Sequence, residues 1–399
     1  MPSSKRLNTQ YILIQLAYWA VCAALLAYQT TLLLHRGFTN TQVGVLLAVR
    51  CFAGVVAQPL VGSYADKHPN LPLKYILTLC LGVAFFAGLI HMLPMGMVGT
   101  AAVLVFLGAL EISAYPLVDS MAVQFIQVGA NVPYSLGRGL GSLAYAATSM
   151  FIGFQAGRLG VETTLVTHSV LVLVLMAAVV TFPRFDPEWR RKDGEKTAAQ
   201  APKNALRLLR DNPRFALMLV GILLGITACL PMSNFCINII RAKGGTDAHL
   251  GVAIFLMSGS ELPAALLFDR LYRKGRAGAI LTFSMASVAV KAFLTILAPN
   301  YWMVWLLQPT QMLGYGLFTP ASVFYVSDAI SPEDQVKGQT LMMMASNGLG
   351  GMLGSALGGR MLDLGGVNGM LWMCVAMGTA AALLTAFAVF PRLWRKDGA

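Results

Sequence analysis

Apolar runs of about eighteen or more residues recur along the whole chain, and each is long enough to cross a bilayer core as an α-helix. The chain is 57% apolar and 12% charged, with a mean hydropathy of +0.67, and these values exclude an ordinary soluble domain. Inside a bilayer the backbone must satisfy its own hydrogen bonds, which helices do within one segment. The sequence therefore predicts an all-α polytopic membrane protein.

The apolar runs predict twelve transmembrane helices in two groups of six. The only long polar stretch separates the sixth run from the seventh. We therefore predict an N-terminal six-helix bundle at 1–183, a cytoplasmic linker at 184–213 and a C-terminal six-helix bundle at 214–399. Within the linker, residues 204–211 have the pattern of a short amphipathic helix. The expected spans are 11–35, 41–65, 73–93, 98–126, 134–157, 163–183, 214–241, 248–269, 277–297, 300–327, 337–360 and 367–390.

Charged residues recur at nearly the same spacing in the two halves. Asp66 and Asp269 each follow a late proline in an apolar run and lie 203 residues apart. Arg158 and Arg360, each beside a glycine, lie 202 residues apart. Internal repeats of this kind are typical of transporters made from two related bundles. The two bundles are therefore expected to be pseudo-symmetric.

Basic residues are distributed unequally between the two sides of the expected membrane. With the N-terminus inside, 21 of the 29 Lys and Arg residues fall in inner loops and tails, five in outer loops and three within helices. This positive-inside asymmetry places both termini in the cytoplasm and attracts the protein to anionic lipid. The net charge of +12 therefore does not indicate nucleic-acid binding. We expect a multi-pass protein of the cytoplasmic (inner) membrane.

Cysteine and histidine positions give no reason to expect a metal, a cofactor or an enzyme. All six cysteines lie in apolar runs without the spacing of metal ligands, which indicates a packing role. We find no nucleotide-binding loop and no arrangement of a nucleophile with a base. The histidines fall near expected helix ends or in turns, so no histidine proton relay is expected; they are His35, His68, His91, His168 and His249.

Six ionisable side chains fall well inside the expected helices. A charge at mid-membrane costs about 2.5–3.5 kcal/mol or more unless it faces a partner or a watery cavity. Depth along the helices favours pairing Asp119 with Arg138, and Arg50 with Glu111 as a weaker second pair. Either pair is functional or is a structural clamp that fixes helix register. The six are Arg50, Glu111, Asp119, Arg138, Glu261 and Lys291.

Several short motifs resemble the major facilitator superfamily, and within it the branch of oligosaccharide and nucleoside proton symporters related distantly to lactose permease. The segment 58–67, QPLVGSYADK, resembles the signature loop between the second and third helices. Residues 116–119, PLVD, resemble the fourth-helix motif whose acid binds sugar in lactose permease, and Arg138 resembles its fifth-helix partner. The implied gating residues are Gly62, Asp66 and Lys67, with Asp269 and Arg270 at the repeated position.

The resemblance implies a solute site and a proton site. Asp119 would accept hydrogen bonds from solute hydroxyls, Arg138 would donate to them, and Tyr145 would stack on a ring. Glu261, in a segment similar to the eighth-helix acid motif, would be the coupling acid, with Glu111 and Asp119 as alternatives. Lys291 matches a ninth-helix arginine in charge only. Neutral hydrogen bonds would come from Gln311, Asn234, Asn238 and Asn347, although Gln311, Gly314 and Asn347 stand where lactose permease has His, Glu and Lys.

The implied function is secondary active transport of a small polar organic solute, similar to a sugar, an oligosaccharide or a nucleoside. The implied mechanism is proton symport by alternating access in a monomer. One alternative is a proton-coupled exporter of drug-like or amphipathic compounds, which the 21 methionines would suit. Another is an importer of aromatic or organic acids, which Arg50, Arg138 and Lys291 would suit. A non-transport role, as a membrane enzyme or receptor, is the remaining alternative.

Overall fold

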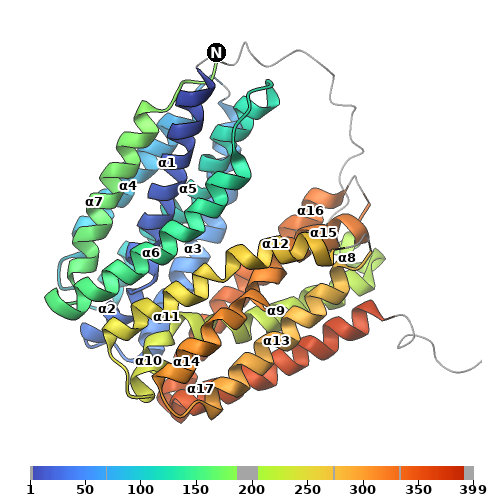
Figure 1. The fold of residues 1–399 in the computed structure, drawn as a ribbon. Coiled ribbons are helices and arrows are strands. Elements are labelled where there is room, and N and C mark those ends of the chain that lie inside the picture. Colours follow the sequence, from blue (N-terminus) through green and yellow to red (C-terminus); the bar gives the residue numbers. More distant parts are fainter. Residues whose placement is uncertain (1–2, 69, 187–204, 273–274, 332–333, 391–399) are drawn as a thin grey trace, which may run out of the picture. The chain divides into compact units, whose positions relative to one another are not determined.

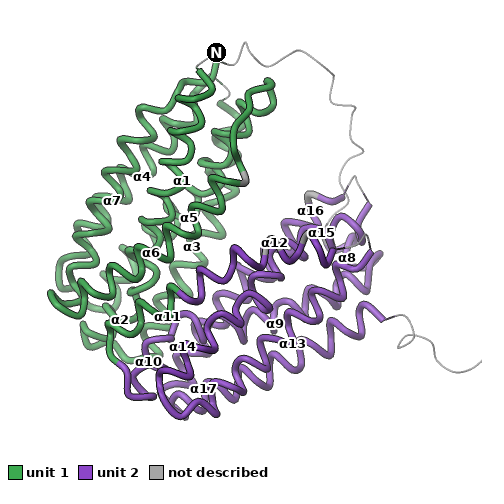
Figure 2. The backbone as a smooth tube through the Cα atoms, viewed as in Figure 1, with its two compact units in different colours: residues 1–194, 246–255 green, residues 195–245, 256–399 purple. Residues whose placement is uncertain are grey.

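The computed structural model describes residues 3–68, 70–186, 205–272, 275–331 and 334–390, and within them every regular element is a helix (Figure 1). The all-α prediction is therefore confirmed. The chain forms two compact units, residues 1–194 with 246–255 and residues 195–245 with 256–399 (Figure 2).

Unit 1 contains α1 to α7, and the first turns of α11 are grouped with it. Its helices are α1 Ser4–Leu26, α2 Gln29–His35, α3 Asn40–Lys67, α4 Leu73–His91, α5 Met97–Gln127, α6 Tyr134–Leu159 and α7 Thr163–Thr181.

Unit 2 contains the remaining elements, among them the short α8 that the linker pattern predicted, and of α11 only the end from Leu256. Its helices are α8 Ala205–Asp211, α9 Pro213–Asn234, α10 Cys236–Ala242, α11 Asp247–Gly259, α12 Glu261–Leu271, α13 Ala277–Leu297, α14 Tyr301–Leu307, the 3₁₀ turn η2 Gln308–Met312, α15 Tyr315–Ala329, α16 Gln335–Met343, the π-helical turn η4 Met344–Gly350 and α17 Gly351–Val389.

Eight helical stretches in the described residues are long and apolar enough to cross a membrane. Within the last of them, Gly366 adopts φ 62°, a left-handed conformation that divides α17 into two helical segments. The count of twelve spans stays a prediction, because several expected spans are broken into shorter helices. The eight stretches are Ser4–His35, Asn40–Lys67, Leu73–His91, Met97–Gln127, Thr163–Thr181, Pro213–Asn234, Ala277–Leu297 and Lys337–Val389.

The expectation of continuous helices was wrong at four positions. The first and seventh spans each end in a separate seven-residue helix, α2 and α10, so the break itself is repeated between the units. The eighth span breaks at Ser260. The tenth passes through η2, where Pro309 lacks the N–H that an α-helix needs.

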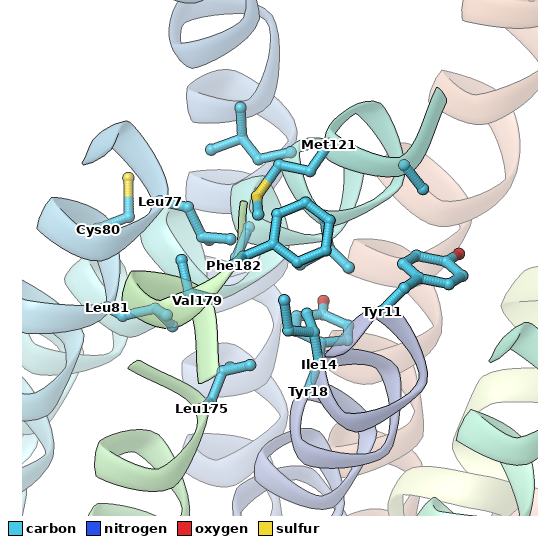
Figure 3. Close-up of a cluster of buried hydrophobic side chains, with 14 of the residues drawn as sticks. Tyr11, Ile14, Tyr18, Leu77, Cys80, Leu81, Met121, Leu175, Val179 and Phe182 are labelled. Atoms are coloured by element: carbon cyan, nitrogen blue, oxygen red, sulfur yellow. The ribbon is translucent and has the colours of Figure 1, made fainter. Parts of the chain in front are cut away.

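Each unit has its own hydrophobic core. In unit 1 the core joins α1, α4, α5 and α7, and Figure 3 shows side chains from these helices converging. In unit 2 the core joins helices α9, α12, α13, α15 and α17. The residues labelled in Figure 3 are Tyr11, Ile14, Tyr18, Leu77, Cys80, Leu81, Met121, Leu175, Val179 and Phe182.

Glycines let α3 and α5 approach each other closely. A Cβ built on Gly108 would collide with the backbone carbonyl of Arg50, and one built on Gly54 would collide with Ile112. Small residues permit such contact where apolar burial gives helices little reason to associate. Gly62 makes no such close contact, since no described atom lies within 4 Å of a Cβ built there.

We predict that Gly108→Ala lowers the free energy of unfolding by about 1–3 kcal/mol, because its methyl group has no space against the α3 backbone. Gly82→Ala, on α4, is the matched control, because a Cβ there meets no described atom within 4 Å. That change should be neutral or stabilise by up to about 1 kcal/mol. Unfolding of both variants in detergent checks this; equal stability would contradict it.

Candidate functional site

Asp119 of α5 is the centre of a polar cluster in unit 1. Its Oδ2 accepts hydrogen bonds from the Tyr134 hydroxyl at 2.9 Å and from Arg138 NH1 at 3.2 Å. Its Oδ1 accepts one from Gln15 Nε2 at 3.1 Å. The side chains of Asp119 and Arg138 are 17% and 32% exposed, so both remain accessible to a small molecule. The structure thus contains the pair that helix depth favoured.

Aromatic rings surround the Arg138 guanidinium. Its central carbon lies 4.8 Å from the centre of the Tyr115 ring and 6.0 Å from that of Trp19. Trp19 packs edge-on against Tyr145, at 6.3 Å between ring centres. Cation–π contacts hold a guanidinium in place while leaving its N–H groups free to donate. The cluster therefore presents charged hydrogen-bonding groups beside apolar ring faces.

Helical spacing explains how these side chains come together. On α1, Tyr11, Gln15 and Trp19 recur every four residues, and so lie near one another along one face. The Gln15 amide also donates to the Tyr11 hydroxyl at 2.8 Å. On α5, Tyr115 stands four residues before Asp119, on the same face.

The sequence reasoning missed five members of this cluster. A signal was available in the first apolar run, where aromatic and amide side chains recur at helical spacing instead of aliphatic ones. Their contact with Asp119 and Arg138 was not readable, because it depends on how α1 packs against α5 and α6. The five are Tyr11, Gln15, Trp19, Tyr115 and Tyr134.

Glu111 is the centre of a second, more deeply buried cluster. Its Oε2 accepts from Arg50 NH2 at 2.7 Å, so the second expected pair is present. Its Oε1 lies 2.7 Å from His168 Nε2. His168, which the sequence placed near a helix end, is fully buried and contacts an acid in the middle of α5. The position of His168 near the N-terminal end of α7 did not predict its contact with Glu111, because helix packing decides which residues touch.

Lys291 on α13 has amide partners instead of an acid. Its ammonium donates to Gln311 at 2.8 Å and to Gln308 at 3.2 Å. Both glutamines belong to η2, and a 3₁₀ helix has three residues per turn, so residues three apart face the same way. Glu261 makes no ion pair within 4.0 Å in the described residues, so the acid and the cation of unit 2 do not pair with each other there.

The remaining expected ligands belong to unit 2. Asn234 donates to the Ser355 hydroxyl at 3.0 Å, and Asn347 accepts from the Tyr315 hydroxyl at 3.4 Å. Asn238 lies on α10. The structure therefore divides the expected solute ligands between the two units.

The expected gating residues lie at helix ends. Asp66 and Lys67 are exposed in the last turn of α3, and Arg270 is exposed in the last turn of α12. The side chain of Asp269 lies outside the described part of the structure.

Two units of apolar helices, each with buried ionisable groups, define a membrane transporter of the major facilitator fold. The chain belongs to the MFS_1 like family, which it matches over residues 8–374. The maltose permease of Geobacillus stearothermophilus is 25% identical over 382 residues, 94% of this chain and 93% of that protein. The uncharacterized transporter YwbF of Bacillus subtilis (strain 168) is 20% identical over 336 residues, 82% and 80% of the two chains.

Solved structures agree on the fold. The crystal structure of the nucleoside transporter NupG matches with a TM-score of 0.82 at 14% identity, covering 98% of this chain and 100% of that chain. The human organic anion transporter MFSD10 (TETRAN) matches with a TM-score of 0.63 at 15% identity, covering 96% and 100%. The prediction of a facilitator, not an enzyme, is therefore confirmed.

We predict that Gln311→Leu destabilises the protein by about 1–3 kcal/mol, because the buried Lys291 ammonium loses its shorter hydrogen bond. In a Lys291→Met background, Gln311→Leu should lower the free energy of unfolding by less, and the difference is a coupling energy of about 0.5–3 kcal/mol. Unfolding of the two single variants and the double variant in detergent measures this coupling. Strictly additive effects would show that the Lys291–Gln311 contact does not contribute to stability.

Proposed function

We propose that this protein moves a small polar organic solute, similar to a sugar, an oligosaccharide or a nucleoside, across the cytoplasmic membrane. The observation that carries the proposal is the Asp119 cluster in unit 1. A carboxylate, a guanidinium, an amide and a phenol lie within one hydrogen-bonded group, beside the rings of Trp19, Tyr115 and Tyr145.

The chemistry of the cluster suits a polyhydroxylated ring. Hydroxyl groups both donate and accept, so they match an acceptor carboxylate beside donor groups. The apolar face of a sugar or a nucleobase can lie on an aromatic ring, and such pockets combine apolar walls with a few placed polar groups. The maltose permease relative and the nucleoside transporter fold support the same solute class.

The proposed mechanism is proton symport by alternating access, with solute taken up as protons enter. Glu261, Glu111 and Asp119 are the candidate coupling acids, and within the described part of the chain only Glu111 among the three contacts a histidine. We place the protein in the inner membrane as a monomer with both termini in the cytoplasm, in contact with anionic lipid. The positive-inside distribution of Lys and Arg supports this orientation.

The exporter and organic-acid alternatives predict different ligands. An organic acid would pair with Arg138 and would not require the Asp119 carboxylate. A lipophilic compound would use the rings and would be insensitive to either charge. The ligand preference of Asp119 and Arg138 variants therefore separates the three possibilities.

We predict that maltose or uridine raises the apparent unfolding temperature of the purified protein, because a ligand that binds only the folded state stabilises it. Asp119→Asn and Arg138→Gln should each weaken that binding at least about tenfold, since each removes a charged hydrogen-bonding group worth about 1.5–3 kcal/mol. Benzoate and tetraphenylphosphonium are the comparison ligands.

Arg158→Gln is the matched control for Arg138→Gln. Arg158 lies on the same helix, α6, but is exposed and outside the cluster. The Arg158→Gln variant should bind the solute with the same affinity as the unaltered protein. Stabilisation by tetraphenylphosphonium that survives both site variants would support the exporter. Stabilisation by benzoate that survives Asp119→Asn but not Arg138→Gln would support the organic-acid importer.

We predict that Tyr145→Leu weakens solute binding about three- to tenfold, whereas Tyr145→Phe stays within about twofold, because the ring face provides the contact, worth about 0.5–1.5 kcal/mol. Isothermal titration with the solute identified above measures both. If Tyr145→Phe loses as much affinity as Tyr145→Leu, the hydroxyl, not the ring, makes the contact.

A further inference from the structure

The contacts of Glu111 assign a hydrogen to one nitrogen of His168. Glu111 accepts from Arg50 through Oε2 and lies 2.7 Å from His168 Nε2 through Oε1. A carboxylate only accepts hydrogen bonds, so Nε2 must carry the hydrogen that it shares with Glu111. The opposite nitrogen, Nδ1, is then the basic atom of the ring. This is the arrangement in which a buried acid fixes the tautomer of an imidazole that takes up protons elsewhere.

The basic nitrogen of His168 faces α4. A Cβ built on Gly88 would lie 3.2 Å from Nδ1, so α4 leaves room at this nitrogen by lacking a side chain. In the described residues Nδ1 has no hydrogen-bond partner, although His168 is completely buried. A buried nitrogen without a partner is costly, and such an exception indicates a function or an ordered water.

His91 continues this cluster towards the end of unit 1. It stands one turn after Gly88 on α4, is completely buried, and neither ring nitrogen has a partner among the described residues. Its backbone carbonyl accepts from Arg36 at 2.8 Å. Arg36 also binds both carboxylate oxygens of Glu162, at 2.8 and 2.7 Å, and the Glu162 side chain is 46% exposed.

The ionisable groups thus form a series from the surface to the middle of α5. Glu162 and Arg36 stand at the exposed end, Arg36 binds the backbone carbonyl of His91, and His168 contacts Glu111. The charged or titratable groups that act on Glu111 come from α1, α3 and α7. They are Tyr18 and Cys22 on α1, Arg50 on α3 and His168 on α7, whereas Arg36, Glu162 and His168 act on His91 of α4.

We propose that Arg50, Glu111 and His168 form the proton-binding site of this transporter. The proton binds to His168 Nδ1, giving an imidazolium that stays hydrogen-bonded to Glu111 through Nε2. Its release from Nδ1 restores the neutral ring, and no other bond changes. This proposal rests on proton-coupled transport and assigns its proton site.

The proton site is connected to the solute cluster by packed side chains. Glu111, Tyr115 and Asp119 recur every four residues on α5, so one face of this helix carries both sites. The Tyr18 hydroxyl donates to the Glu111 backbone carbonyl at 3.2 Å, and the Tyr18 ring lies 6.0 Å from that of Tyr115. Tyr115 in turn contacts Arg138. A change of charge at His168 therefore reaches the groups that hold Asp119.

Two measurements test the site. The first is side-chain ¹⁵N NMR of the full-length protein with labelled histidine, in detergent, with and without His168→Gln to assign the signal. We expect His168 to carry hydrogen on Nε2, and Nδ1 to gain a second proton as the folded protein is acidified. A neutral ring with hydrogen on Nδ1, or no protonation before unfolding, overturns the proposal. This measurement needs no solute.

The second measurement uses proteoliposomes with labelled maltose and labelled uridine. His168→Gln should lose uphill accumulation driven by a proton gradient at least about tenfold, while exchange of internal for external solute continues, because exchange needs no net proton movement. His35→Gln is the matched control, an exposed histidine at the end of α2.

The outcomes separate the proton site from the proposed function. Unchanged accumulation in His168→Gln overturns the proton site. Loss of exchange together with accumulation assigns His168 a structural role and also overturns it. If neither solute binds the unaltered protein, the proposed solute class is wrong, and the NMR titration still decides whether His168 binds the proton.

Discussion

The fold depends on satisfying charges in an environment that does not solvate them. A carboxylate or a guanidinium within apolar helices is stable only beside a partner. The low dielectric strengthens each ion pair and also raises the free-energy cost of a charge that has no partner. In unit 1, Arg50 on α3 and His168 on α7 each bind Glu111 on α5. These contacts fix how the three helices meet, and the glycines Gly54 and Gly108 bring α3 and α5 close enough to make them.

One face of α5 combines the two sites of unit 1. The same four-residue spacing places Glu111 in the dry part of the bundle and Asp119 among polar and aromatic side chains, with Tyr115 between them. The proposed proton site and the proposed solute site are thereby joined by one helix and the rings packed on it. In unit 2 the buried cation Lys291 donates hydrogen bonds to the neutral amides of Gln308 and Gln311. The 3₁₀ turn at Gln308–Met312 places both amides on the side that faces Lys291.

Much of the architecture and part of the site were predictable from the sequence. The Asp119–Arg138 and Arg50–Glu111 pairs followed from charge and depth, because buried charges need opposite partners. His168 did not follow, since its place in the second turn of α7 gives no indication of what α5 places against it. The break at Phe235 was also missed, because a continuous apolar run does not show where its helix stops.

The sequence by itself determined the environment, the all-helical class and the presence of buried charges, because length and hydropathy decide whether a helix can cross a bilayer. It also carried the motifs of the major facilitator superfamily. Only the tertiary structure decided which groups meet: Gln15 and Tyr134 at Asp119, His168 at Glu111, and two glutamines at Lys291. The physical reason is that these contacts join residues up to about one hundred positions apart, and their geometry is set by helix packing rather than by local sequence.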